Sequence, residues 1–104
     1  MLAVTSLNRV PSIPEVPTLA ESGFPGYDMN DWNGIFAASG TPAPIIAQFA
    51  TALARACADP GVKQRMDPLG AVMVGSTPAE FARWLEAQRV ICEQVIREAD
   101  IRLG

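Results

Sequence analysis

Three times in the C-terminal two thirds of this chain, a residue that can cap a helix stands directly before a proline. The pairs are Thr41-Pro42, Asp59-Pro60 and Thr77-Pro78. A capping side chain accepts a hydrogen bond from a free amide at the helix start, and proline at the first helical position has no amide that needs a partner. The pairs therefore predict three helices, which run from Pro42 to about Ala58, from Pro60 toward Asp67, and from Pro78 to about Ala99.

The last of these helices has the clearest pattern. Thr77 and Glu80 have the spacing of a capping box. One arc of about 140° is apolar, and it contains Phe81, Trp84, Leu85, Ile91, Cys92, Val95, Ile96 and Ala99. The opposite face carries charges at i,i+4 spacing, which predicts exposure to solvent. The first helix has its own apolar face, made by Ile45, Phe49, Ala52, Leu53 and Ala56.

Short apolar runs predict three strands, at Leu2–Thr5, Trp32–Ala38 and Ala71–Val74. The prolines between the first two runs forbid regular pairing there, and Thr18–Gly23 is long enough for one helical turn. We therefore expect an α/β fold with short strands and three C-terminal helices. The 104 residues have the size of a single domain, and we expect a part with strands and prolines at 1–40 and a helical part at 41–104.

Composition excludes several classes of function. Eight scattered basic and eleven acidic residues give a net charge of −3, so no basic patch for nucleic acid is expected. With no histidine, the chain lacks the common general base and the His-dependent nucleophile systems. Two cysteines cannot close a zinc site. The sequence therefore predicts no enzyme, no metal and no cofactor. It contains no membrane-spanning run, and Met1–Ser6 does not have the pattern of a signal peptide.

A few local features needed a choice between binding and packing. The acidic segment Asp28–Gly34 does not match a calcium loop, so a polar turn is favoured. The helix starts after Gly40 and Gly75 are assigned to capping rather than anion binding. Trp84 is assigned to the core, and Trp32 is left open between packing and lining a cleft. The thiols of Cys57 and Cys92 are predicted to be buried, and whether they pair stays open.

Several segments together resemble one known family. They are LAVTS, RVPSIPEVPTLAESGFPGY, WNGIFAASGTP and GSTPAEFARWLEAQ followed by IREADIRLG. The chain is similar, essentially end to end, to the C-terminal third of the periplasmic solute-binding proteins of tripartite tricarboxylate transporters, the Bordetella uptake gene family.

The resemblance implies part of a periplasmic-binding-protein type II fold, in which two lobes close on a small carboxylate and deliver it to membrane permease subunits in the periplasm. A strand like Trp32–Ala38 would carry the chain back between the lobes. Trp32 and Asn33 would then lie near the interlobe cleft as ligand-binding residues.

The resemblance also implies missing parts, because the family's signal peptide, its first lobe sheet and its ligand-gripping loops precede the point that matches Met1. We expect a fragment of a receptor that does not bind ligand alone. The alternative is a truncated interaction protein that forms homo-oligomers through its unpaired strands. The residues that would choose the solute are not in this sequence.

Overall fold

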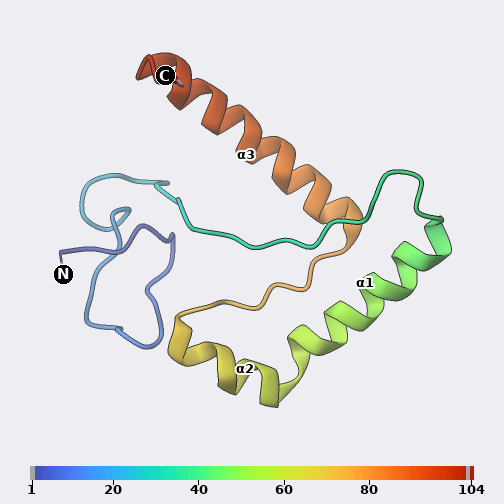
Figure 1. The fold of residues 1–104 in the computed structure, drawn as a ribbon. Helices are drawn as coiled ribbons and strands as arrows, with labels where there is room; N and C mark the ends of the chain where they lie inside the picture. The colour runs from blue at the N-terminus through green and yellow to red at the C-terminus, as the bar shows by residue number, and fades with distance from the viewer. Residues whose placement is uncertain (1, 103) are drawn as a thin grey trace.

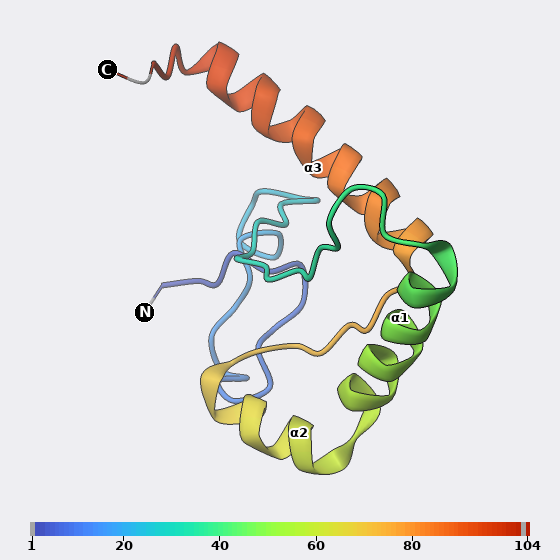
Figure 2. The ribbon, with the colours of Figure 1, turned by 45° about the vertical axis from the view of Figure 1, so that its right-hand side comes forward.

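A computed structural model describes residues 2–102 and 104 of the chain. Its regular elements are, in order, α1 (Ala43–Ala58), α2 (Pro60–Met66), the short 3-10 helix η1 (Asp67–Leu69) and α3 (Pro78–Glu98). The N-terminal ends of α1 and α3 lie near each other in two views, and the helices point away from each other beyond that corner (Figures 1 and 2). Met1, in the segment tested for a signal peptide, lies outside the described residues.

Helix α1 begins one residue later than the sequence predicts. Its N-cap is Pro42, with no side-chain cap, and the Thr41 hydroxyl donates instead to the Ala38 carbonyl at 2.7 Å. A cap at Thr41 would serve the amides of Ala43 and of residue 44, but Pro44 has no amide. The predicted cap at Thr41 is therefore wrong, because a second proline removes one of its two donors.

The other two helix starts confirm the prediction. Asp59 accepts hydrogen bonds from the amides of Gly61 and Val62, at 2.8 and 3.1 Å. At the start of α3, Thr77 and Glu80 form the reciprocal capping box: Glu80 N–H donates to the Thr77 hydroxyl at 3.2 Å, and Thr77 N–H donates to the Glu80 carboxylate at 2.8 Å. These caps fix both helix starts by local contacts alone.

Residues 2–29 fold into a loop-rich unit. Val4 and Thr18 form an isolated parallel β-bridge, in which Val4 N–H donates to the Pro17 carbonyl and Leu19 N–H donates to the Val4 carbonyl, both at 2.9 Å. The predicted strand Leu2–Thr5 is thus reduced to one bridge residue, Val4, because Pro17 has no amide to continue a ladder.

The predicted turn at Thr18–Gly23 is present as a series of turns. Glu21 N–H donates to the Thr18 hydroxyl at 3.1 Å, and Thr18 N–H donates back to the Glu21 carboxylate at 2.9 Å. Gly23, with φ +107°, takes the left-handed conformation that ends the turn. Arg9 pairs with Glu21 at 3.0 Å and ties this turn to the preceding loop.

The other two predicted strands are not strands here. Residues 32–38 and 71–74 are extended, but neither segment belongs to a β-ladder in the described part of the chain. A strand becomes regular only when a neighbouring strand accepts and donates its backbone hydrogen bonds. The prediction of strands at these two places is therefore wrong for the described residues, because residues 2–102 do not supply the pairing that a strand needs.

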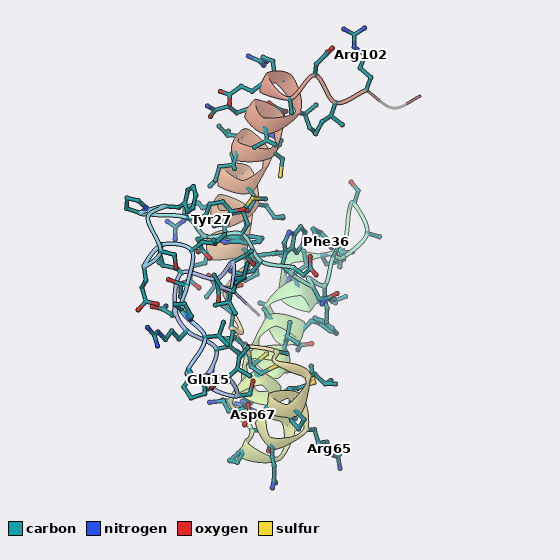
Figure 3. The ribbon with its side chains drawn as sticks, turned by 90° about the vertical axis from the view of Figure 1, so that its left-hand side faces the viewer. Glu15, Tyr27, Phe36, Arg65, Asp67 and Arg102 are labelled. Atoms are coloured by element: carbon teal, nitrogen blue, oxygen red, sulfur yellow. The ribbon has the colours of Figure 1, made fainter. Side chains whose placement is uncertain are left out.

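Little of the chain is buried. The accessible surface is 8556 Å², against roughly 5,700 Å² for a compact protein of this mass. The radius of gyration is 16.8 Å, against about 13 Å for a compact domain of this length. Among the described residues, the buried side chains are Val16, Thr18 and Cys57. Arg65 and Asp67 lie at one end and Arg102 at the other (Figure 3).

The apolar faces of the helices are mostly open. On α1 the covered positions are Ile46, Ala50, Leu53 and Cys57, whereas Ile45 and Phe49 of the predicted apolar face are more than half exposed. On α3 the apolar residues from Ile91 onward are exposed, Cys92 included. The prediction that Cys92 is buried is wrong for this reason, and both cysteines are free thiols.

Candidate functional site

Four aromatic side chains join segment 31–38 to the first half of α3. The Trp32 ring lies edge-on to Phe81 and to Trp84, with centroid distances of 5.9 and 5.2 Å. Phe36 contacts Phe81 with a centroid distance of 5.5 Å, and Phe81 stacks near Trp84 at 6.1 Å. Edge-to-face pairs at such distances stabilise beyond the area they bury. We call Trp32, Phe36, Phe81 and Trp84 the aromatic cluster.

Gly34 allows the segment to lie directly on α3. A Cβ atom at this position would stand 3.0 Å from Cε1 of Phe81 and 3.3 Å from Cζ3 of Trp32. Such contacts are too short for a methyl group unless a ring moves. The glycine between Trp32 and Phe36 thus fits this close approach, and a larger residue there would make the end of the Phe81 ring shift.

The two predicted ligand-binding residues lie next to each other at the start of this segment. The Trp32 ring contacts Trp84 of α3 and is still 45% exposed, so the same side chain packs on the helix and reaches solvent. Asn33 is exposed, and in the part of the chain that the structure describes its amide has no hydrogen-bond partner. Both side chains reach solvent, but successive residues of an extended segment point to opposite faces, so they open onto different sides of the segment. Trp32 packs on α3, and its lining of a cleft stays a prediction.

The sequence reasoning missed the partners of Trp32. It assigned Trp84 to a core, but Trp84 is 39% exposed and packs against Trp32 in a T-shaped pair. The sequence reasoning also did not predict that Phe36 and Phe81 contact each other. The alternation of Trp32, Gly34 and Phe36 places all three on one side of an extended segment, and that pattern was the available signal.

A shallow open groove runs between α1 and the segment before α3. Its walls are mostly small side chains of α1 together with residues 75–78. Gly75, at φ +62°, brings the backbone so close that a Cβ there would stand 3.0 Å from Cβ of Cys57 and 3.4 Å from Cα of Ala54. Thr77 at one end is already engaged in its capping box. The groove therefore offers packing surface more than polar contacts.

The titratable groups with shifted pKa values all lie in surface contacts. The hydrogen bond from Thr77 N–H lowers the pKa of Glu80, the Arg9 guanidinium lowers the pKa of Glu21, and Arg89 lowers that of Glu86. Each of these carboxylates is a capping group or half of an exposed ion pair. Such shifts are what structural contacts produce, and they bring no acid and base together.

The described residues contain neither a cluster of metal ligands nor a helix that could span a membrane. Within 2–102 and 104, no three Cys, Asp or Glu side chains converge in a way that could hold a metal ion. Each helix in this same part of the chain is too short or too polar to span a bilayer.

Comparison with known proteins identifies a family. The family model described as tripartite tricarboxylate transporter family receptor, TctC, matches residues 1–101. A UPF0065 protein from the tcbD-tcbE intergenic region of Pseudomonas sp. strain P51 is 36% identical over 98 residues, which are 93% of this chain and 29% of that protein. Protein BugT of Bordetella pertussis is 28% identical over 102 residues, covering 98% of this chain and 31% of BugT.

Two solved structures share the arrangement. The periplasmic binding protein BugD has a TM-score of 0.81 and 33% identity, over 96% of this chain and 34% of BugD. R. palustris Rpa4515 with adipate has a TM-score of 0.83 and 33% identity, over 96% of this chain and 33% of that protein. The chain thus spans about three tenths of the curated relatives and a third of the solved ones.

Proposed function

Because the chain belongs to the tripartite tricarboxylate transporter receptor family, we propose that it supplies the C-terminal portion of a periplasmic receptor for small carboxylates. Such a receptor passes its solute to the permease subunits of the transporter. The observation that carries the proposal is the match over residues 1–101 together with a TM-score above 0.8 to two solved relatives. The relatives are receptors and binding proteins, and nothing in the described site suggests a different class.

The ligand-binding residues of this portion are Trp32 and Asn33. Asn33 has a free side-chain amide, which can donate to a carboxylate oxygen. Trp32 is fixed on α3 by the aromatic cluster, so its exposed side can line an apolar wall without losing its position. The R. palustris relative was solved with adipate, a chain of methylene groups between two carboxylates, which needs both kinds of contact.

The chain does not bind ligand tightly by itself. A small-molecule site buries most of its ligand's surface between walls, and the surface around Asn33 is open among the described residues. We expect calorimetry with adipate to give no micromolar dissociation constant for the 104-residue chain alone.

A chimera tests the proposal. The third of R. palustris Rpa4515 that this chain matches is replaced by this chain, and adipate binding is measured by calorimetry. We expect binding to remain, and Asn33→Ala to weaken it about tenfold or more, since hydrogen bonds to charged groups contribute about 1.5–3 kcal/mol. Asn30→Ala is the matched control and leaves binding unchanged. A folded chimera without adipate binding would refute the carboxylate receptor, and equal affinity of both variants would remove Asn33 from the site.

A second candidate is an interaction protein that pairs with another copy of itself. The observation in its favour is the extended segments 32–38 and 71–74, which belong to no β-ladder in the described part of the chain. Their backbone hydrogen bonds there are limited to the Ala38 carbonyl and the Ala71 N–H, at their ends. It predicts a concentration-dependent dimer of the chain alone. Light scattering at high micromolar concentration separates the two candidates, because a clean monomer contradicts self-association.

A further inference from the structure

The extended segment 32–38 has one face on α3 and a second face that points away from that helix. Trp32 and Phe36 both contact Phe81, with ring centroid distances of 5.9 and 5.5 Å. A Cβ atom at Gly34, midway between them, would stand 3.0 Å from Cε1 of the same ring. Every second residue here thus faces α3, and Figure 1 shows the segment passing the start of this helix.

Asn33 and Ile35 lie between these positions, so their side chains point to the opposite face of the segment. Both side chains are exposed, and the exposed fraction of Ile35 is 58%. Two positions of an extended chain span roughly 6.6 Å, so a small molecule bound at Asn33 has the Ile35 side chain beside it. This face therefore presents an amide and a large apolar side chain next to each other.

The two side chains fit two neighbouring parts of one kind of solute. The Asn33 side-chain amide can donate to a carboxylate oxygen. Ile35 has a branched apolar surface, and contact with it removes methylene groups of a solute from water, which is favourable. Adipate, the solute in the R. palustris structure, has methylene groups directly beside its carboxylates.

We propose that Ile35 is a further solute-contacting residue, which packs against the carbon chain of a carboxylate held by Asn33. Trp32 lies on the other face and holds the segment on α3 through the aromatic cluster, so its packing sets the position of both side chains. The inference rests on the proposed function, because the class of solute comes from there. It adds the residue that recognises the apolar part of that solute.

The alternative is that another segment of a whole receptor covers Ile35 permanently. An apolar cover over this face would also bury the neighbouring Asn33 amide, and a buried amide without a hydrogen-bond partner is costly. A solute with a carboxylate beside its methylene groups satisfies both side chains at once. The adjacent amide therefore favours the solute over a packing contact.

Two substitutions at one position test the inference in the chimera with R. palustris Rpa4515. Ile35→Val should weaken adipate binding about fourfold, the effect of one buried methylene group, and Ile35→Ala more than about tenfold. Neither change should lower the melting temperature of the empty chimera by more than about 2 °C. Ile45→Ala is the matched control, because Ile45 of α1 is similarly exposed, at 54%, and it should leave the affinity unchanged.

Chemical labelling locates the side chain with and without the solute. In a chimera without other cysteines, Ile35→Cys should react with a maleimide while the site is empty. Saturating adipate should slow this reaction about tenfold or more, since a bound small molecule is mostly buried against its contacts. Ile45→Cys is the control, and adipate should not change its reaction rate.

Three results overturn the inference. They are an adipate affinity that Ile35→Ala leaves unchanged, a weaker affinity that comes with an equally destabilised empty chimera, and an Ile35→Cys thiol that is unreactive before adipate is added. A folded chimera that binds no adipate refutes the carboxylate receptor, and the role of Ile35 with it. Adipate binding that does not depend on Ile35 refutes this inference alone, so the two failures are distinguishable.

Discussion

Residues 2–29 contain almost no regular secondary structure, yet they are held together across the chain, whereas residues 43–98 are mostly helical and are held together weakly. In the first region, contacts distant in sequence include Val4 with Thr18, Thr5 with Met29 and Arg9 with Glu21. In the second, α1 packs on α2 and α2 on η1, while α3 has no comparable packing with another described helix.

The difference shows that backbone order and burial are separate properties of this chain. A helix satisfies its backbone within itself and at its caps, so α3 can be regular with its apolar side open. The loop of 2–29 has no such internal pairing, and it is ordered only because its side chains and backbone find partners from one end to the other. Thr18, 1% exposed, is at the centre of those contacts.

The largest expected effect is that of Thr18→Val. The change removes the hydroxyl that accepts Glu21 N–H, and leaving a part-buried donor unpaired costs about 2 kcal/mol. We expect the amides of Val4 and Leu19 to exchange roughly thirtyfold faster, while the helices are unaffected. The control is Thr51→Val, which removes an exposed hydroxyl that donates to Ala47 O. Equal effects of both changes would contradict the special role of the loop contact.

A smaller effect is expected from Thr77→Ala, which removes the capping box of α3. Loss of such a cap costs about 1 kcal/mol, so the first amides of α3 should exchange about fivefold faster, with residues 2–29 unchanged. Thr41→Ala is the comparison, because Thr41 caps no helix, and it should leave exchange in α1 unaltered. Propagation of the Thr77 effect into the N-terminal loop would show that the two regions are coupled.

The smallest effect is a pH dependence at the same cap. Ionised Glu80 accepts Thr77 N–H, which lowers the pKa of its carboxyl, and Arg83 nearby adds to this. A carboxyl with a lowered pKa stabilises the fold above its ordinary value of about 4.3, and this contribution disappears as the pH falls through the lowered pKa. We expect the Thr77 amide resonance to titrate below about pH 4.3.

Glu80→Gln is the control for that titration, since the amide oxygen still accepts but does not ionise. It should remove the pH dependence of the Thr77 resonance. A midpoint at the ordinary glutamate value, or a titration that persists in the variant, would contradict the assigned hydrogen bond.

Much of the helical part could be predicted from sequence, because its signals are local. The pairs at Asp59-Pro60 and Thr77-Pro78 and the apolar periodicity act within a few residues of themselves. The predicted cap at Thr41 is wrong because of another local signal: Pro44 has no backbone N–H to donate to it. The prediction of strands at 32–38 and 71–74 is wrong for a different reason. The apolar pattern of these segments is visible in the sequence, but a β-ladder needs a partner strand that is far away in the chain.

Only part of the candidate site could be predicted from the sequence. Trp32 and Asn33 came from a resemblance, and their role stays a prediction. That Trp32 would meet Phe81 and Trp84 depends on how an extended segment crosses a helix about 50 residues later. The glycine at position 34 is a local signal for a close approach, but which rings come near depends on contacts far apart in the sequence.

Between the two regions, the chain has one short stretch, Asn30 and Asp31, whose backbone makes no hydrogen bond within the described residues. Met29 N–H donates to the Thr5 carbonyl on one side, and Trp32 is clamped on α3 on the other. Asn30 and Asp31 contribute two soft dihedral angles each, and the Asn30 side-chain amide donates to the Asp28 carboxylate at 2.7 Å. The path of the chain from the loop to α3 therefore depends on that local contact and on the rings that hold Trp32.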